Sequence, residues 1–268
     1  MLKLIVLALP VSLFGLNIEP WFCNVYEFTF SPSYTYSRYR HVQHGHPQLK
    51  NVSNDHLIAC DIAVPPAPNW EVDADVEFAQ TPRQSMGLRS MGGQLRYLCL
   101  DDVVGDLVSL TIGASIRGVS KHSVRDVSSP YHSYFNAELT TSMGREWDSR
   151  FHWRFRAYGF GAIGMANHGY PWSRAFATLE GNLHNTHILS LFTGGDIGFG
   201  PHKQVNVDHF HGYASIQHRS IDVGIQYTYV AEIWGRIKLA YTRRLYARSF
   251  PQNMNFFTVS YMLPFSLF

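Results

Sequence analysis

The amino-acid sequence predicts an all-β fold, a closed antiparallel transmembrane β-barrel of about 12 strands, with 14 as the alternative. Apolar and polar residues alternate with a period of two along most of the chain, as expected for strands whose two faces meet different surroundings. Charged residues make up 16% of the chain and aromatic residues 15%, whereas roughly a quarter of a soluble protein is charged. Beyond the N-terminus no apolar run approaches the ~20 residues of a membrane-spanning helix.

The N-terminus predicts a cleaved signal peptide over residues 1–15. Lys3 precedes an apolar run from Leu4 to about Leu16, which is short for a membrane helix but suits the hydrophobic region of a signal peptide. The alternative is an uncleaved N-terminal anchor. Residues 16–268 contain no linker, so we expect them to form a single barrel domain. The three cysteines are too few for a disulfide framework.

Segments with strand periodicity recur along the rest of the chain, separated by Gly, Pro, Asn and Ser. They cover residues 25–40, 56–64, 69–80, 94–100, 107–118, 131–141, 150–161, 173–181, 187–200, 209–217, 221–230, 236–244 and 255–268. Bacterial barrels contain an even number of strands, so we expect one of these about 13 segments to be no barrel strand. Longer loops are expected at 41–54, 81–93 and 119–130.

The stretch NWEVDADVEFAQ, residues 69–80, alternates with almost no interruption. One face carries the acidic residues Glu71, Asp73, Asp75 and Glu77, and the other carries Trp70, Val72, Ala74, Val76 and Phe78. Carboxylates two residues apart on a strand stand ~7 Å from one another, so they form a row and do not converge on a cation. We expect this acidic row to line the lumen of the barrel.

Two other strands carry basic residues on one face. They are His152, Arg154 and Arg156 in RFHWRFRAYGFG, and Arg236, Lys238 and Arg244 in RIKLAYTRR. We expect these rows to face the acidic row across the lumen, with Arg154 and Arg156 opposite the carboxylates. In a wide barrel such rows filter solutes by charge, whereas in a narrow barrel they interlock and block passage.

The C-terminal stretch NFFTVSYMLPFSLF places Phe257, Val259, Tyr261, Leu263, Phe265 and Leu267 in one parity. It resembles the terminal strand by which bacterial outer-membrane barrel proteins are recognised for assembly. The resemblance implies a location in the outer membrane of a Gram-negative bacterium, with membrane lipids and the barrel-assembly machinery as partners. Phe268 is out of phase with Phe265, so we expect a bulge near Pro264 or a frayed end.

One fragment suggests an enzyme. In YASIQHRSIDVG, His218 and Ser220 share a parity with Ile216, which we assign to the lipid face. The fragment resembles the His-x-Ser motif of outer-membrane lipid A deacylases and phospholipases, and Glu232 would orient the histidine in such a Ser-His-Glu set. Those enzymes place asparagine after the serine, whereas this chain has Ile221 there.

A second candidate site is a histidine cluster. His41, His44 and His46, in RYRHVQHGHP, have a spacing that suits a weak metal site in a surface loop, with Asp55 nearby. No other cofactor is expected, and a net charge of +2 indicates no nucleic-acid surface.

We therefore expect a non-enzymatic outer-membrane barrel, acting as a narrow pore or as a structural and surface-interaction protein. The alternatives are a lipid-acyl hydrolase on the same scaffold and a soluble secreted β-protein. The sequence names neither a solute nor a surface partner.

Overall fold

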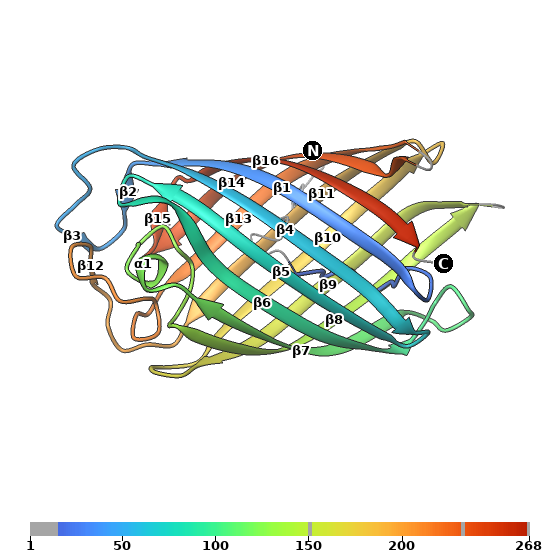
Figure 1. Ribbon diagram of the computed structural model, residues 1–268, viewed down its shortest axis with the longest axis horizontal. Coiled ribbons are helices and arrows are strands. Elements are labelled where there is room, and N and C mark those ends of the chain that lie inside the picture. The colour runs from blue at the N-terminus through green and yellow to red at the C-terminus, as the bar shows by residue number, and fades with distance from the viewer. Residues whose placement is uncertain (1–15, 150–151, 232–233, 267–268) are drawn as a thin grey trace, which may run out of the picture.

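A computed structural model describes residues 16–149, 152–231 and 234–266; the predicted signal peptide lies outside these residues. Twelve tilted antiparallel strands form a closed barrel, which confirms the predicted fold class and strand number (Figure 1). Each strand pairs with its neighbours along the chain, and the first strand closes the ring against the last. The strands are β1 (Glu27–Tyr39), β4 (Ser53–Ala67), β5 (Trp70–Thr81), β6 (Gln84–Leu100), β7 (Ser109–Val119), β8 (Phe135–Ser149), β9 (His152–Ala166), β10 (Trp172–Leu183), β11 (His187–Gly198), β13 (Arg219–Val230), β14 (Arg236–Arg248) and β16 (Asn255–Ser266).

The outer face of the barrel is apolar. Large exposed side chains such as Val72, Ile116, Leu139 and Ile163 come from the outward parity of their strands, whereas the inward parity is polar. A soluble β-protein buries its apolar face, so the soluble alternative is wrong. No helix in the described part of the chain is long and apolar enough to cross a membrane.

Two expectations about the elements are wrong. Residues 209–217 form no barrel strand; they belong to the connection between β11 and β13, and they alternate because Phe210, Ala214 and Ile216 are buried beneath it. Residues 81–93 form no long loop, because a tight turn at Thr81 leads into β6 at Gln84. The Thr81 hydroxyl accepts the backbone N–H of Gln84 there.

The last strand runs in register with β1 through Pro264, which pairs with Thr29, so the described residues contain no bulge at the proline. Phe268 lies outside the described residues. Pro264 faces the lumen. The next residue, Phe265, points outward and stacks on Phe28 with 5.3 Å between the ring centroids.

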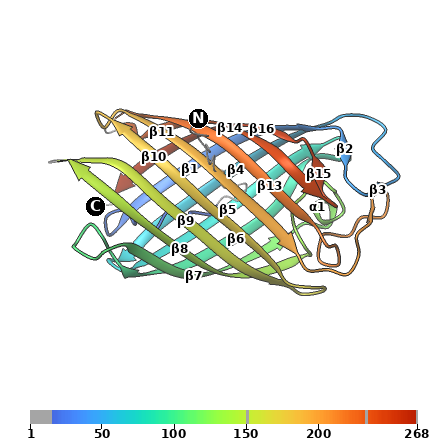
Figure 2. The ribbon, with the colours of Figure 1, turned by 180° about the vertical axis from the view of Figure 1, so that it is seen from behind.

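The two ends of the barrel differ. Most turns at one end are short, and the end of β16 and the start of β1 lie there; we call it the short-turn end (Figures 1 and 2). The other end carries the long connections β1–β4, β7–β8 and β11–β13, and we call it the long-loop end.

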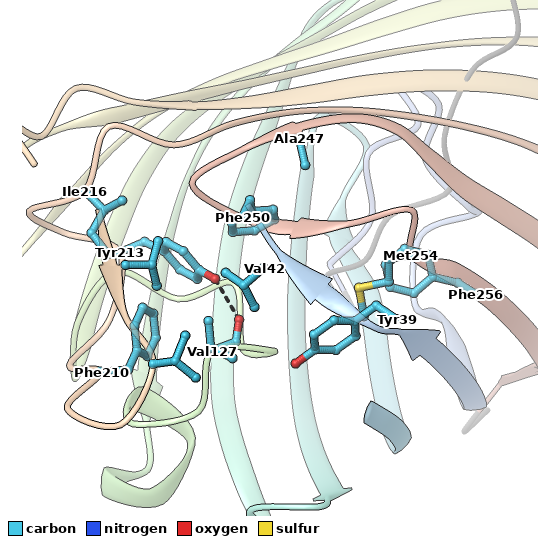
Figure 3. Packing of buried hydrophobic residues seen from close by; sticks show 12 residues of the cluster. Tyr39, Val42, Val127, Phe210, Tyr213, Ile216, Ala247, Phe250, Met254 and Phe256 are labelled. Carbon is cyan, nitrogen blue, oxygen red and sulfur yellow. Dashed lines mark hydrogen bonds between the residues drawn. The ribbon is translucent and has the colours of Figure 1, made fainter. Parts of the chain in front are cut away.

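The long loops fold over their end of the barrel as a cap. The cap contains α1 (Lys121–Val124) and two small sheets, one pairing β2 (His41–Val42) with β15 (Pro251–Gln252), the other pairing β3 (Gly45–His46) with β12 (Val205–Asn206). Its apolar core joins residues from four connections, as Figure 3 shows. The members are Tyr39, Val42, Val127, Val205, Val207, Phe210, Tyr213, Ile216, Ala247, Phe250, Met254 and Phe256. The Tyr213 hydroxyl donates to the Val127 carbonyl, 2.7 Å away, and so ties two loops together.

Candidate functional site

The acidic row of β5 faces the lumen and is buried there. Glu71, Asp73 and Glu77 are each 1% exposed and Asp75 is 5% exposed, whereas Val72 between them is 43% exposed on the outer face. Four carboxylates in such a setting require partners, because an unpaired buried charge is very costly.

The partners come from the neighbouring strands and not from across the lumen. Arg96 of β6 donates through Nε to Glu71, its direct cross-strand neighbour, at 3.0 Å. Arg117 of β7 makes two bonds to Asp75, at 2.7 and 2.8 Å, and its Nη1 lies 3.6 Å from Glu77. The expectation that Arg154 and Arg156 answer this row is therefore wrong. Adjacent strands are ~5 Å apart, far closer than opposite walls of a 12-stranded barrel.

A glycine between the two partners allows the Asp75–Arg117 pair to form. Gly92 of β6 is the cross-strand neighbour of both residues, so the ion pair passes over a position without a side chain. A Cβ at Gly92 would stand 2.5 Å from Asp75 Oδ1 and 2.8 Å from Arg117 Nη2. The sequence alone does not indicate this role, because Gly92 lies outside the strand predicted at residues 94–100.

Other ion pairs continue around the lumen. Arg156 of β9 pairs with Glu146 of β8 at 2.5 Å, Arg174 with Glu138 at 2.5 Å, and Arg244 with Asp222 at 2.6 Å. Arg154 is exposed near the start of β9. His152 begins β9, and its side chain lies outside the described part of the structure. Sequence reasoning missed Arg96, Arg117, Glu138, Arg174 and Asp222 as lumen residues, although each lies on the polar parity of its strand.

The chain's own N-terminal segment, residues 16–24, lies inside the barrel. Ile18 packs on Phe160 and Phe176, which point inward from β9 and β10. The backbone N–H of Asn17 donates to Asp73 Oδ2 at 2.7 Å, and Arg96 Nη1 donates to the backbone carbonyl of Glu19. No periodicity or motif in LNIEPWFCN indicates this placement.

A cavity of about 540 Å³ lies between this segment and the opposite wall, in the half of the barrel next to the short-turn end. Its wall combines hydroxyl, charged and aromatic side chains. They include Thr29, Ser31, Ser33, Asp61, Tyr158, Thr178, Glu180, Ser190, Arg236, Lys238, Thr258 and Ser260. Arg236 and Lys238 of the predicted basic row thus border open space, and Lys238 Nζ lies 3.9 Å from Glu19 Oε1.

The half of the lumen beneath the cap is more densely filled. Cavities of about 30 and 40 Å³ occur there, each with room for about two or three waters at 10–15 Å³ per water. The rings of His132 and Trp172 stack with their centroids 3.7 Å apart, and the rings of His218, Tyr213 and Phe250 all contact one another.

The expected orientation of the His-x-Ser pair is wrong. His218 is 1% exposed and Ser220 is 3% exposed, and both point inward, whereas Ile221 is 47% exposed on the outer face. The assignment failed because Phe210, Ala214 and Ile216 are buried under the cap and do not face lipid, so the parity that His218 and Ser220 share with them is the inward one. Glu232 lies outside the described residues. A serine enclosed beneath the cap has no access to membrane lipid, so the geometry offers no support for a lipid-acyl hydrolase.

The three loop histidines lie in the cap. His41 belongs to β2 and His46 to β3, two different small sheets, and His44 Nδ1 lies 3.3 Å from the Ser249 hydroxyl. Among the described residues no group of three His, Cys, Asp or Glu side chains is arranged to hold a metal ion. The structure therefore does not assemble the predicted metal site.

Comparison with known proteins places the fold. No protein-family model matches the sequence, and no curated protein matches it either. Among solved structures, the COG4313 outer membrane channel from Pseudomonas putida F1 is similar with a TM-score of 0.64 and 8% identity, over 91% of this chain and 97% of that chain. The NanC porin has a TM-score of 0.57 at 7% identity, over 87% and 98% of the two chains. The KdgM porin has a TM-score of 0.52 at 9% identity, over 88% and 99%. The chain shares the β-barrel fold of these outer-membrane channels.

Proposed function

We propose that this protein is an outer-membrane channel for small polar solutes, held closed in the present conformation by its cap. The main evidence for a channel is the cavity of about 540 Å³ inside the barrel, which is lined by hydroxyl and charged side chains. A barrel that served only as a structural element needs no open polar interior, because side chains can fill it. The structural neighbours described as channels and porins support the same function.

The orientation follows from the loops. Outer-membrane barrels have short periplasmic turns and longer extracellular loops, so the cap is on the extracellular side and the cavity opens toward the periplasm. The apolar outer face suits contact with lipid, and the closed ladder leaves no unpaired strand edge there.

The cap is the closed gate of this channel. Phe250 is 3% exposed, contacts the rings of Tyr213 and His218, and lies under the Arg244 guanidinium at 4.4 Å. Replacing a buried Phe by Ala costs about 3–5 kcal/mol, which is enough to shift the population of an element held by one small apolar core.

Planar-bilayer recording of Phe250→Ala tests the function. We expect the parent protein to conduct rarely and the variant to show frequent openings, because the cap core is weakened. Leu139→Ala is the control, because it also shortens a large apolar side chain, but on the exposed outer face of β8. It should behave like the parent protein. A properly folded Phe250→Ala protein that stays silent would refute a channel function.

A further inference from the structure

The N-terminal segment binds the lumen wall through contacts of several kinds. Besides the two backbone bonds to Asp73 and Arg96, the Trp21 indole N–H donates to Asp102 Oδ1 at 2.9 Å. The Arg156 guanidinium lies over the Trp21 ring at 4.6 Å, and Tyr158 meets the same ring edge-on at 5.6 Å. Hydrogen bonds, ion contacts and apolar packing together define one bound conformation.

The wall is shaped to receive this segment. Gly144 of β8 faces it, and a Cβ there would stand 2.8 Å from Pro20 Cγ and 3.0 Å from Trp21 Cη2. Pro20 is buried, and Ile18 is 8% exposed against inward-facing rings of β9 and β10. A gap in the wall therefore coincides with the bulkiest part of the segment.

The segment also satisfies charges that would otherwise face the lumen. Among the described residues no arginine forms an ion pair with Asp73, and the backbone N–H of Asn17 donates to its Oδ2. Arg96 divides its donors between Glu71 and the Glu19 carbonyl. The acidic wall thus recognises the backbone of an extended peptide as well as its side chains.

We propose that the lumen wall formed by β5 to β10 is a peptide-binding surface whose occupant is this chain's own segment 16–24, which acts as a tethered plug. The plug fills the side of the lumen opposite the cavity and sets the width of the passage. Its release enlarges the pore and exposes the carboxylates of β5 to solute. This inference rests on the proposed channel function for its physiological meaning, but peptide binding can be tested apart from conduction.

The test loosens the plug without altering the wall. Ile18→Ala with Trp21→Ala is made in the Phe250→Ala background, so that the cap is not limiting, and Val25→Ala in the same background is the control, since Val25 is exposed just outside the segment. We expect unitary conductance to rise about two-fold, with a shift toward cations, because the acidic wall becomes part of the pore. The control should not change.

A synthetic peptide of residues 16–24, added on the short-turn side, should then return the loosened channel to its lower conductance. The same peptide with alanine at both positions should not. Equal conductance of the loosened and parent channels, or an inactive peptide, overturns the plug while leaving the channel intact.

Thiol labelling tests the release of the plug without a measurement of ion conductance. Cys23 lies on the segment and borders the cavity, whereas Cys60 and Cys99 lie on the lipid-facing parity of β4 and β6. Loosening the plug should raise the rate at which a membrane-impermeant thiol reagent modifies Cys23, read by mass spectrometry. If every protein is electrically silent, the channel function fails and labelling decides the plug: a faster rate supports it and an unchanged rate overturns it.

Discussion

At the scale of single residues, the interior is organised by charges paired along the wall. Asp75 is 5% exposed and Arg117 is 7% exposed, so little solvent screens the pair. Breaking a buried pair by removing or displacing one partner costs about 3–5 kcal/mol, whereas a surface pair contributes about 0–1 kcal/mol. Such pairs therefore matter for the stability of the barrel as well as for the charge of its lumen.

Gly92→Ala tests this pairing without removing a charge. The new Cβ would stand 2.5 Å from Asp75 Oδ1 and 2.8 Å from Arg117 Nη2, so the ends of both side chains must move aside. We expect a loss of stability toward urea in detergent or lipid of at most about 3 kcal/mol, which is the cost of a broken buried pair. Gly118→Ala, where a Cβ meets nothing within 4 Å, is the matched control and should leave the stability unchanged. Equal urea midpoints for the two variants would show that the pair adapts.

At the scale of elements, the cap is a small folded unit attached to a rigid barrel. Its base contains His132 and His218, whose ring centroids are 5.0 Å apart. Burial lowers the pKa of His132 well below its usual range, and His218 and Arg174 add to the effect. Burial, with Arg244 nearby, lowers the pKa of His218 to about 3.

These lowered pKa values predict that acid opens the cap. An opened cap lets both histidines bind protons near the usual pKa of about 6.5, so their contribution to closure is complete above that pH. It is lost progressively as the pH falls from 6.5 toward 3, and for His218 alone the loss at pH 5 is about 2 kcal/mol. Open probability in bilayers should rise between pH 7 and pH 4, and His218→Phe should reduce that rise. A pH-independent open probability would contradict the assignment.

At the scale of the whole molecule, closure of the strand ladder makes the barrel one cooperative unit. Every long strand has two hydrogen-bonded neighbours, and β1 and β16 complete the ring. A closed ladder with an apolar exterior resists detergent, because no strand edge is left for solvent to invade.

Heat-modifiable migration follows from this closure. Unheated protein in mild detergent should migrate faster on a gel than boiled protein, because the folded barrel is compact and binds less detergent than the unfolded chain. The expected two bands should merge after boiling. A single band at all temperatures, with protein soluble in the absence of detergent, would contradict the membrane barrel.

The sequence by itself determined the fold class and which residues of each strand share a face, because a strand alternates its side chains whatever its neighbours are. It predicted about 12 barrel strands with 14 as the alternative, and the structure has 12. Residues 70–81 show this most clearly. Only the tertiary structure decided which charges meet: Glu71 meets Arg96, and Asp75 reaches Arg117 over Gly92, since these contacts depend on strand register. It also decided that residues 209–217 belong to the cap and that residues 16–24 lie in the lumen. The local sequence pattern predicts neither placement, because each segment takes its conformation from the cavity or apolar core that surrounds it.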